Sequence, residues 1–158
     1  MSNGFIFYET KDIVCILTPD TSNPKTGDEG QTWIIYKHEP PHVAIDTGKD
    51  SIICGDCKHR GKVLSFKDAL KYANILSNVK KKALLKRIDT KREKGFNSIN
   101  VDRKCYVTTW QAPLSIYKAW KKGNYPTLTP KQAQKRLAYK KVRLGSYGDP
   151  VHVPLEVW

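Results

Sequence analysis

The stretch Cys54-Gly55-Asp56-Cys57-Lys58-His59-Arg60 sets two cysteines on a turn that contains glycine, with a histidine close behind them. A C-x2-C turn of this kind directs two sulfur atoms at one ion and needs further ligands to complete a tetrahedron. The sequence offers His59 and the distant Cys105 for that purpose. We therefore predict a metal site made of Cys54, Cys57, Cys105 and His59, which would join the two halves of the chain.

Zinc is the ion that this ligand set fits best, because three cysteines and one histidine are typical of structural zinc sites and the bound ion adds folding free energy. An iron–sulfur cluster held by the three cysteines is one alternative, and free thiols are the other. Cys15 is left out because it lies in the apolar run 13–17, where a lone cysteine is usually a small core residue. His38 and His42 are second choices after His59, since they are farther from the turn along the chain.

Short stretches rich in β-branched and aromatic residues predict strands before the cysteine turn and near the end of the chain. Proline, glycine and asparagine make residues 19–31 a predicted loop. The predicted strands cover residues 5–8, 13–17, 32–36, 43–45 and 142–147.

Apolar residues at helical spacing, set among many lysines, predict helices within residues 61–103. Ser65, followed by Asp68 three residues later, has the pattern of a capping box at the start of the first helix. Asparagine and serine over residues 74–78 indicate a break between two helices, and residues 96–100 are a predicted loop.

Two more helices are predicted to begin near Pro113 and Pro130, because proline is tolerated in the first turn of a helix. The second is expected to run to about Lys141. Together these elements predict an α/β (α+β) protein with a single domain over residues 1–158. N-terminal strands are joined through the cysteine metal site to a basic helical segment and a terminal strand. Residues 61–103 are expected to be a basic, mainly helical insertion between the two halves of that site.

The chain is strongly basic, with 28 lysines and arginines against 15 acidic residues and a formal net charge of +13. Residues 61–104 carry 13 lysines and arginines against four acids, and residues 103–148 carry 11 with no acid. Such a field attracts polyanions and favours phosphate backbones by releasing counterions. The predicted nucleic-acid contacts are Lys80, Lys81, Lys82, Lys86, Arg87, Lys91, Arg92, Lys121, Lys122, Lys135, Arg136, Lys140 and Arg143.

Four aromatic residues, Tyr117, Trp120, Tyr125 and Tyr139, lie among the basic residues of the C-terminal third. They could stack on unpaired bases. Their helical spacing favours places in the core instead, so the lysines are the expected contacts. The plainer alternative is a basic surface that only keeps the protein in solution.

Eight stretches together carry a resemblance to known proteins. They are residues 23–27, 31–34, 47–48, 54–60, 105–107, 112–114, 123–126 and 143–150. In combination they resemble an uncharacterised phage and mobile-element family with cysteine clusters and, more remotely, the phage gene product 88 family. The resemblance covers most of the chain and implies an α/β fold. It also implies that this chain is short at its C-terminus and that residues 61–103 are an insertion, but it brings no biochemical role.

Tyr147 and Asp149 are the candidate catalytic residues, because they follow a predicted strand at the end where α/β folds place functional groups. Asp149 could equally cap the last turn. No second carboxylate or histidine is assigned to them, so the sequence favours a binding protein over an enzyme.

The expected function is that of a phage-type, metal-stabilised basic protein that binds nucleic acid, DNA or RNA, or the host machinery that handles it. One alternative is a nucleic-acid-processing metalloenzyme or a reduced relative of iron–sulfur enzymes. Another is a phage-encoded inhibitor of a host defence complex. The sequence shows no apolar signal segment and no long apolar run, so we expect a cytoplasmic protein of an infected or carrying cell, with no membrane partner.

Overall fold

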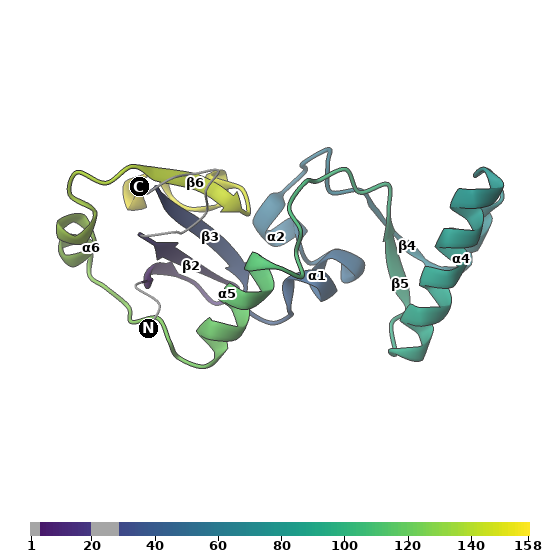
Figure 1. Ribbon diagram of the computed structural model, residues 1–158, viewed down its shortest axis with the longest axis horizontal. Helices are drawn as coiled ribbons and strands as arrows, with labels where there is room; N and C mark the ends of the chain where they lie inside the picture. Colours follow the sequence, from purple (N-terminus) through teal and green to yellow (C-terminus); the bar gives the residue numbers. More distant parts are fainter. Residues whose placement is uncertain (1–3, 20–28) are drawn as a thin grey trace.

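A four-stranded sheet forms the body of the molecule that contains both chain ends (Figure 1). The computed structural model describes residues 4–19 and 29–158. The strands of the sheet are β1 (Phe5–Glu9), β2 (Ile13–Thr18), β3 (Gly30–Tyr36) and β6 (Val142–Tyr147). The first three form an antiparallel meander, and β6 adds to β3 in parallel, which gives the order β1-β2-β3-β6.

These strands confirm the predictions for residues 5–8, 13–17, 32–36 and 142–147. The central strands β2 and β3 are buried along almost their whole length, which explains why they appear in the sequence as nearly continuous apolar runs. Cys15 is fully buried in β2, as predicted. The predicted loop over residues 19–31 lies mostly outside the described residues.

Three helices pack against the sheet and complete its main hydrophobic cluster. Each helix contributes a buried side chain to the cluster that also holds the buried side chains of β2 and β3. These side chains are Ala44, Ile53 and Tyr117. The helices are α1 (Pro41–Thr47), α2 (Ser51–Cys54) and α5 (Ala112–Lys121).

The predicted strand at residues 43–45 is wrong, because these residues lie in α1. Pro41 occupies the first turn of this helix, where its fixed φ fits and no hydrogen-bond donor is needed. Gly48 then ends the helix in the left-handed region, at φ 80°.

Helix α6 (Pro130–Leu137) confirms the predicted start at Pro130 but ends earlier than the expected Lys141. A capping box between Thr129 and Gln132 fixes its start. The chain leaves the helical region at Ala138 and enters β6, and two short 3-10 turns follow. These turns are η1 (Pro150–His152) and η2 (Leu155–Val157).

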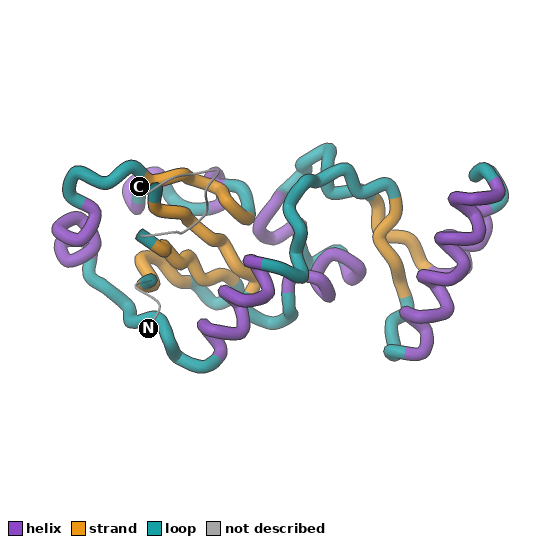
Figure 2. Tube along the Cα trace, viewed as in Figure 1, coloured by secondary structure: helices purple, strands orange, loops and turns teal. Residues whose placement is uncertain are grey.

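The basic residues between the cysteine segments form a separate unit, which we call the β4–β5 unit (Figure 2). Its two strands pair antiparallel, from Lys62 opposite Val101 to Ser65 opposite Ser98. Two helices connect the strands and cover them with a second hydrophobic cluster. The elements are β4 (Lys62–Ser65), α3 (Phe66–Ala73), α4 (Asn78–Glu93) and β5 (Ser98–Val101).

Within this unit the helices were predicted correctly and the strands were not. The side chain of Ser65 accepts a hydrogen bond from the backbone N–H of Asp68, which confirms the predicted cap. The helix break at residues 74–78 is also confirmed. The predicted loop at 96–100 is wrong, because β5 begins there. Each strand has only four residues, too few to give a clear alternating pattern. Whether the unit is an insertion into a single domain stays a prediction.

Among the helices that the structure describes, none has both the length and the apolar composition that crossing a membrane requires.

The cluster of the β4–β5 unit should contribute a large share of that unit's stability. Ile88 is fully buried in it. Ile88→Ala should therefore lower the free energy of unfolding by about 2–5 kcal/mol, through lost burial and the cavity left behind. Urea denaturation followed by circular dichroism measures this. Val79→Ala, an exposed position on the same helix, is the matched control, and equal effects of the two substitutions would contradict the assignment of this core.

Candidate nucleic-acid interface

The two ends of the β4–β5 unit meet at one buried carboxylate. Asp50, only 1% exposed, accepts a hydrogen bond from Nη2 of Arg60 at 2.8 Å and one from Nη1 of Arg103 at 3.3 Å. Arg60 precedes β4 and Arg103 follows β5. Arg60 also donates from Nη1 to the carbonyl of Gly55 at 2.7 Å, which ties the unit to the cysteine turn.

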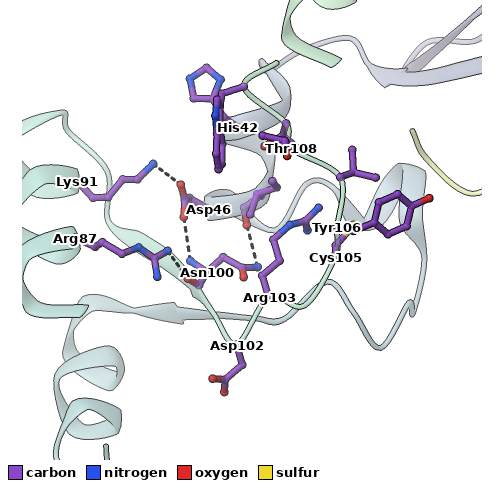
Figure 3. A pocket seen from close by; sticks show the side chains of 14 residues that line it. His42, Asp46, Arg87, Lys91, Asn100, Asp102, Arg103, Cys105, Tyr106 and Thr108 are labelled. Atoms are coloured by element: carbon purple, nitrogen blue, oxygen red, sulfur yellow. Dashed lines mark hydrogen bonds and ion pairs between the residues drawn. The ribbon is translucent and has the colours of Figure 1, made fainter. Parts of the chain in front are cut away.

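A second carboxylate, that of Asp46 in α1, contacts both α4 and β5 of the unit (Figure 3). It forms an ion pair with Lys91 of α4 and accepts a hydrogen bond from the backbone N–H of Asn100 at 3.1 Å. The side-chain amide nitrogen (Nδ2) of Asn100 donates to the backbone carbonyl of Ile45 at 3.4 Å. These contacts fix α4 and β5 relative to α1.

A pocket of about 480 Å³ lies where α1, α4 and β5 meet the segment 105–110, and we call it the α4 pocket. Figure 3 shows Arg87 and Lys91 reaching into this region from α4, with Arg103 and Tyr106 on the side of the 105–110 segment. His42 also lines it, with a buried Nδ1 that has no hydrogen-bond partner among the described residues. Burial, followed by the charge of Lys91, lowers the pKa of His42, so its ring is neutral at pH 7.

One side of α4 carries a line of cations beside this pocket. Lys80, Arg87 and Lys91 are seven and four residues apart, which places them on the same side of a helix. Lys91 is paired with Asp46, and Arg87 donates from Nη2 to the carbonyl of Asn100 at 2.9 Å. Among the described residues, no carboxylate lies within ion-pair distance of Lys80 or Arg87, so their charges are available to a ligand.

The opposite wall of the pocket carries exposed aromatic side chains. Tyr106 is 77% exposed and Trp110 is 69% exposed, and both line the pocket. Tyrosine and tryptophan combine a large apolar ring with a polar group, which makes them frequent at binding surfaces. Neither residue was predicted as a contact; the signal in the sequence was two aromatic residues in a segment without helical or strand periodicity.

The aromatic residues singled out in the sequence have mixed positions. Tyr117 and Tyr125 are buried in the main cluster, as predicted. Trp120 is half-buried against the same cluster. The prediction is wrong for Tyr139, which is fully exposed after α6, where no partner helix follows to cover it.

The predicted basic contacts do not form one continuous surface. One group lies on α4 and another on or beside α6, and these helices are at opposite ends of the elongated molecule (Figure 1). Several of these side chains have intramolecular contacts. Lys81 donates to Asn74, Lys121 lies over the Trp120 ring, and Arg143 donates to the Tyr106 hydroxyl.

The predicted metal ligands are brought only partly together. Cys54 ends α2 and is half-buried, whereas Cys57 and His59 are exposed. The carbonyl of His59 accepts hydrogen bonds from the backbone N–H groups of Lys104 and Cys105, both at 3.0 Å, so the two cysteine segments lie side by side. Nevertheless, within residues 4–19 and 29–158 no three or more histidine, cysteine or acidic side chains are grouped so that they could hold a metal ion. The residues as placed therefore do not form the predicted site.

The environment of Cys54 favours the protonated thiol in the absence of a metal. Burial raises its pKa to about 12, and the nearby Asp50 contributes in the same direction. A thiol must lose its proton to bind zinc, so an ion would have to offset this cost.

Tyr147 and Asp149 differ in their surroundings. Tyr147 is 2% exposed, and its hydroxyl has no hydrogen-bond partner in the described part of the chain. Burial, followed by the charges of Cys54 and Asp50, raises its pKa. Asp149 accepts a hydrogen bond from the backbone N–H of Val151 at 3.1 Å, so it caps η1. This geometry gives no support to a catalytic role for the pair.

Comparison of the chain with protein-family models, with curated proteins and with solved structures finds no match. The resemblance to the phage and mobile-element family therefore stays a prediction.

Asp50 should be a sensitive position, because its buried carboxylate has two arginine partners. Asp50→Asn removes the charge that compensates Arg60 and Arg103, and a broken buried pair typically costs about 3–5 kcal/mol. We expect a loss of stability in this range by urea denaturation. Asp56→Asn, in the exposed part of the cysteine turn, is the control and should shift the free energy of unfolding by no more than about 0.5 kcal/mol. Similar effects at both positions would argue against a special role for Asp50.

Proposed function

We propose that the protein binds single-stranded nucleic acid across the α4 pocket. The observation that carries this proposal is that the exposed rings of Tyr106 and Trp110 line the same pocket as Arg87 and Lys91. Aromatic rings stack on unpaired bases of any sequence, and cations beside them follow the phosphate backbone. The combination suits a strand whose bases are exposed.

Single strands are favoured over duplex for a structural reason. In a duplex the bases present only their edges in the grooves, so ring faces such as those of Tyr106 and Trp110 would have nothing to stack on. The exposed side of α4 carries Asp89 and Glu93 together with Lys82 and Lys86, so these four residues offer no net positive charge to a second phosphate backbone.

The net charge of +13 adds a long-range contribution. It raises the local concentration of polyanions near the surface and makes the affinity depend on salt. Lys80 and Arg87 should make the direct phosphate contacts, while Lys91 holds Asp46 and shapes the pocket.

Fluorescence anisotropy with labelled homopolymeric DNA and RNA oligonucleotides tests this proposal. The affinity should fall steeply between about 50 and 200 mM salt, since phosphate contacts release counterions. Trp110→Ala should cost about 1–3 kcal/mol of binding, the typical value of one stacked base. Arg87→Gln should weaken binding and reduce the salt slope by about one.

Matched controls are available outside the α4 pocket. Tyr139→Ala removes an aromatic ring that is even more exposed, and Lys11→Gln removes an exposed cation on the β1–β2 connection. Neither should change the affinity beyond the small effect of net charge. Binding that is absent, insensitive to salt, or equally weakened by the controls would overturn the proposal. A preference for DNA or RNA would identify the ligand further.

The zinc site of Cys54, Cys57, Cys105 and His59 is a separate proposal. Its support is the C-x2-C spacing and the backbone hydrogen bonds that place Cys105 beside the turn. If the site forms, the exposed part of the turn must close on the ion, because the described side chains do not yet gather.

Elemental analysis of protein purified without chelators tests the metal proposal. About one zinc per chain is expected for the unchanged protein, and Cys105→Ser should lose most of it, since three ligands bind far more weakly than four. Ser51→Ala, a neighbouring exposed position, is the control for the purification. Substoichiometric zinc in the unchanged protein would exclude the site. Iron with visible absorption would favour a cluster instead.

A further inference from the structure

An apolar groove of about 670 Å³ lies between α6 and the sheet, and we call it the α6 groove. Leu137 of α6 and Leu144 of β6 line it, and Leu144 is 49% exposed. The rings of Phe7 and Trp158, with centroids 5.4 Å apart, form another part of the lining. An open apolar surface of this kind is typical of a site that another molecule covers.

Three exposed lysines lie next to residues that line this groove. Lys131 and Lys135 are exposed on α6, next to the helix positions that line the groove, and Lys141 is exposed just before β6. Among the described residues, none of these three lysines forms an ion pair with a carboxylate. Glu156, near the C-terminus, is the one acidic residue among those that line the groove.

We propose that the α6 groove docks an acidic amphipathic helix of a partner protein. Apolar side chains on one face of such a helix would enter the groove, and carboxylates on its flanks would meet the lysines. A partner could instead add a strand to the edge of the sheet beside the groove, but this binding mode is disfavoured at the edge strand β1. Ile6 of that edge strand already donates to the carbonyl of Pro126 at 2.9 Å and accepts from the N–H of Leu128 at 3.0 Å.

The charges argue against the other occupants of an apolar groove. A second copy of this chain would bring a further +13 and another set of lysines to the same place. Nucleic acid has the right sign, but the aliphatic side chains of Leu137 and Leu144 offer its bases no ring face, and the rings of Phe7 and Trp158 pack on each other. The acidic helix satisfies both the apolar lining and the positive rim.

This site is independent of the proposed nucleic-acid interface. Figure 1 places α6 and α4 at opposite ends of the molecule, with the sheet and α1 between them. One molecule could therefore hold an acidic protein at one end while a nucleic acid strand occupies the other. Such a protein would act as an adaptor.

The test uses a labelled synthetic helical peptide of about 18 residues, with leucines at helical spacing on one face and glutamates elsewhere. Its binding to the full chain is followed by fluorescence anisotropy. Leu144→Asp should weaken binding at least about 10-fold, because it places a charge in the apolar groove. A peptide with glutamine in place of glutamate should also bind several-fold more weakly, and added salt should reduce the affinity of the acidic peptide.

Charge reversal on the rim keeps the test decisive if Leu144→Asp destabilises the protein. Lys131→Glu with Lys135→Glu changes two exposed residues one helical turn apart and should weaken peptide binding about 3- to 10-fold. Lys82→Glu with Lys86→Glu has the same spacing and charge change on α4, and it should leave peptide binding within about twofold. Val151→Asp is the control for Leu144→Asp, since Val151 is exposed outside the groove.

The proposal is overturned if the acidic peptide does not bind, or if both pairs of lysine substitutions weaken it equally. It is also overturned if the glutamine peptide binds as tightly, or if the protein alone forms dimers that Leu144→Asp dissociates. Loss of oligonucleotide binding by Arg87→Gln without loss of peptide binding would separate this site from the one at α4.

Discussion

The pairing of Asp50 with Arg60 and Arg103 is the constraint on which the rest of this structure depends. A carboxylate with 1% exposure is costly to bury, and its two partners come from the two ends of the β4–β5 unit. Both ends of the unit must therefore be in place before the charge is compensated. The pairing fixes the position of the unit relative to α1 and α2, and we call it the Asp50 lock. Asp46 adds a second connection through Lys91 and Asn100.

This lock lies where the sequence predicted a cysteine metal site. The prediction identified the correct segments, since the residues around Cys54 and Cys105 do lie side by side. It assigned the connection to thiolates, whereas the described contacts are those of a carboxylate with two arginines. C-x2-C is a local pattern that can be seen in a sequence. An aspartate that meets arginines 10 and 53 residues away leaves no local signature.

The difference between local patterns and contacts of distant residues also explains which other elements could be predicted from the sequence. The strands of the large sheet and the helices with proline or serine at their starts follow from local periodicity and capping, so their predictions hold. The two four-residue strands of the β4–β5 unit depend on each other rather than on a pattern. In the candidate site, the cations of α4 were predicted from charge alone. The exposed aromatic residues Tyr106 and Trp110 could not be, because they share a pocket with those cations only once the unit has docked on α1.

The pairing of β4 with β5 also determines where the chain enters and leaves the unit. Lys62 and Val101 are directly opposite each other, so the chain enters and leaves the unit at neighbouring points. The unit also has a hydrophobic cluster separate from that of the large sheet. A short turn from Gly61 to Asp102 could span the same points, so the unit is geometrically exchangeable: its loss would remove the cations of α4 but no strand of the large sheet. The strands of the large sheet do not depend on the unit, whereas Asp46 of α1 would lose Lys91 and Asn100 with it.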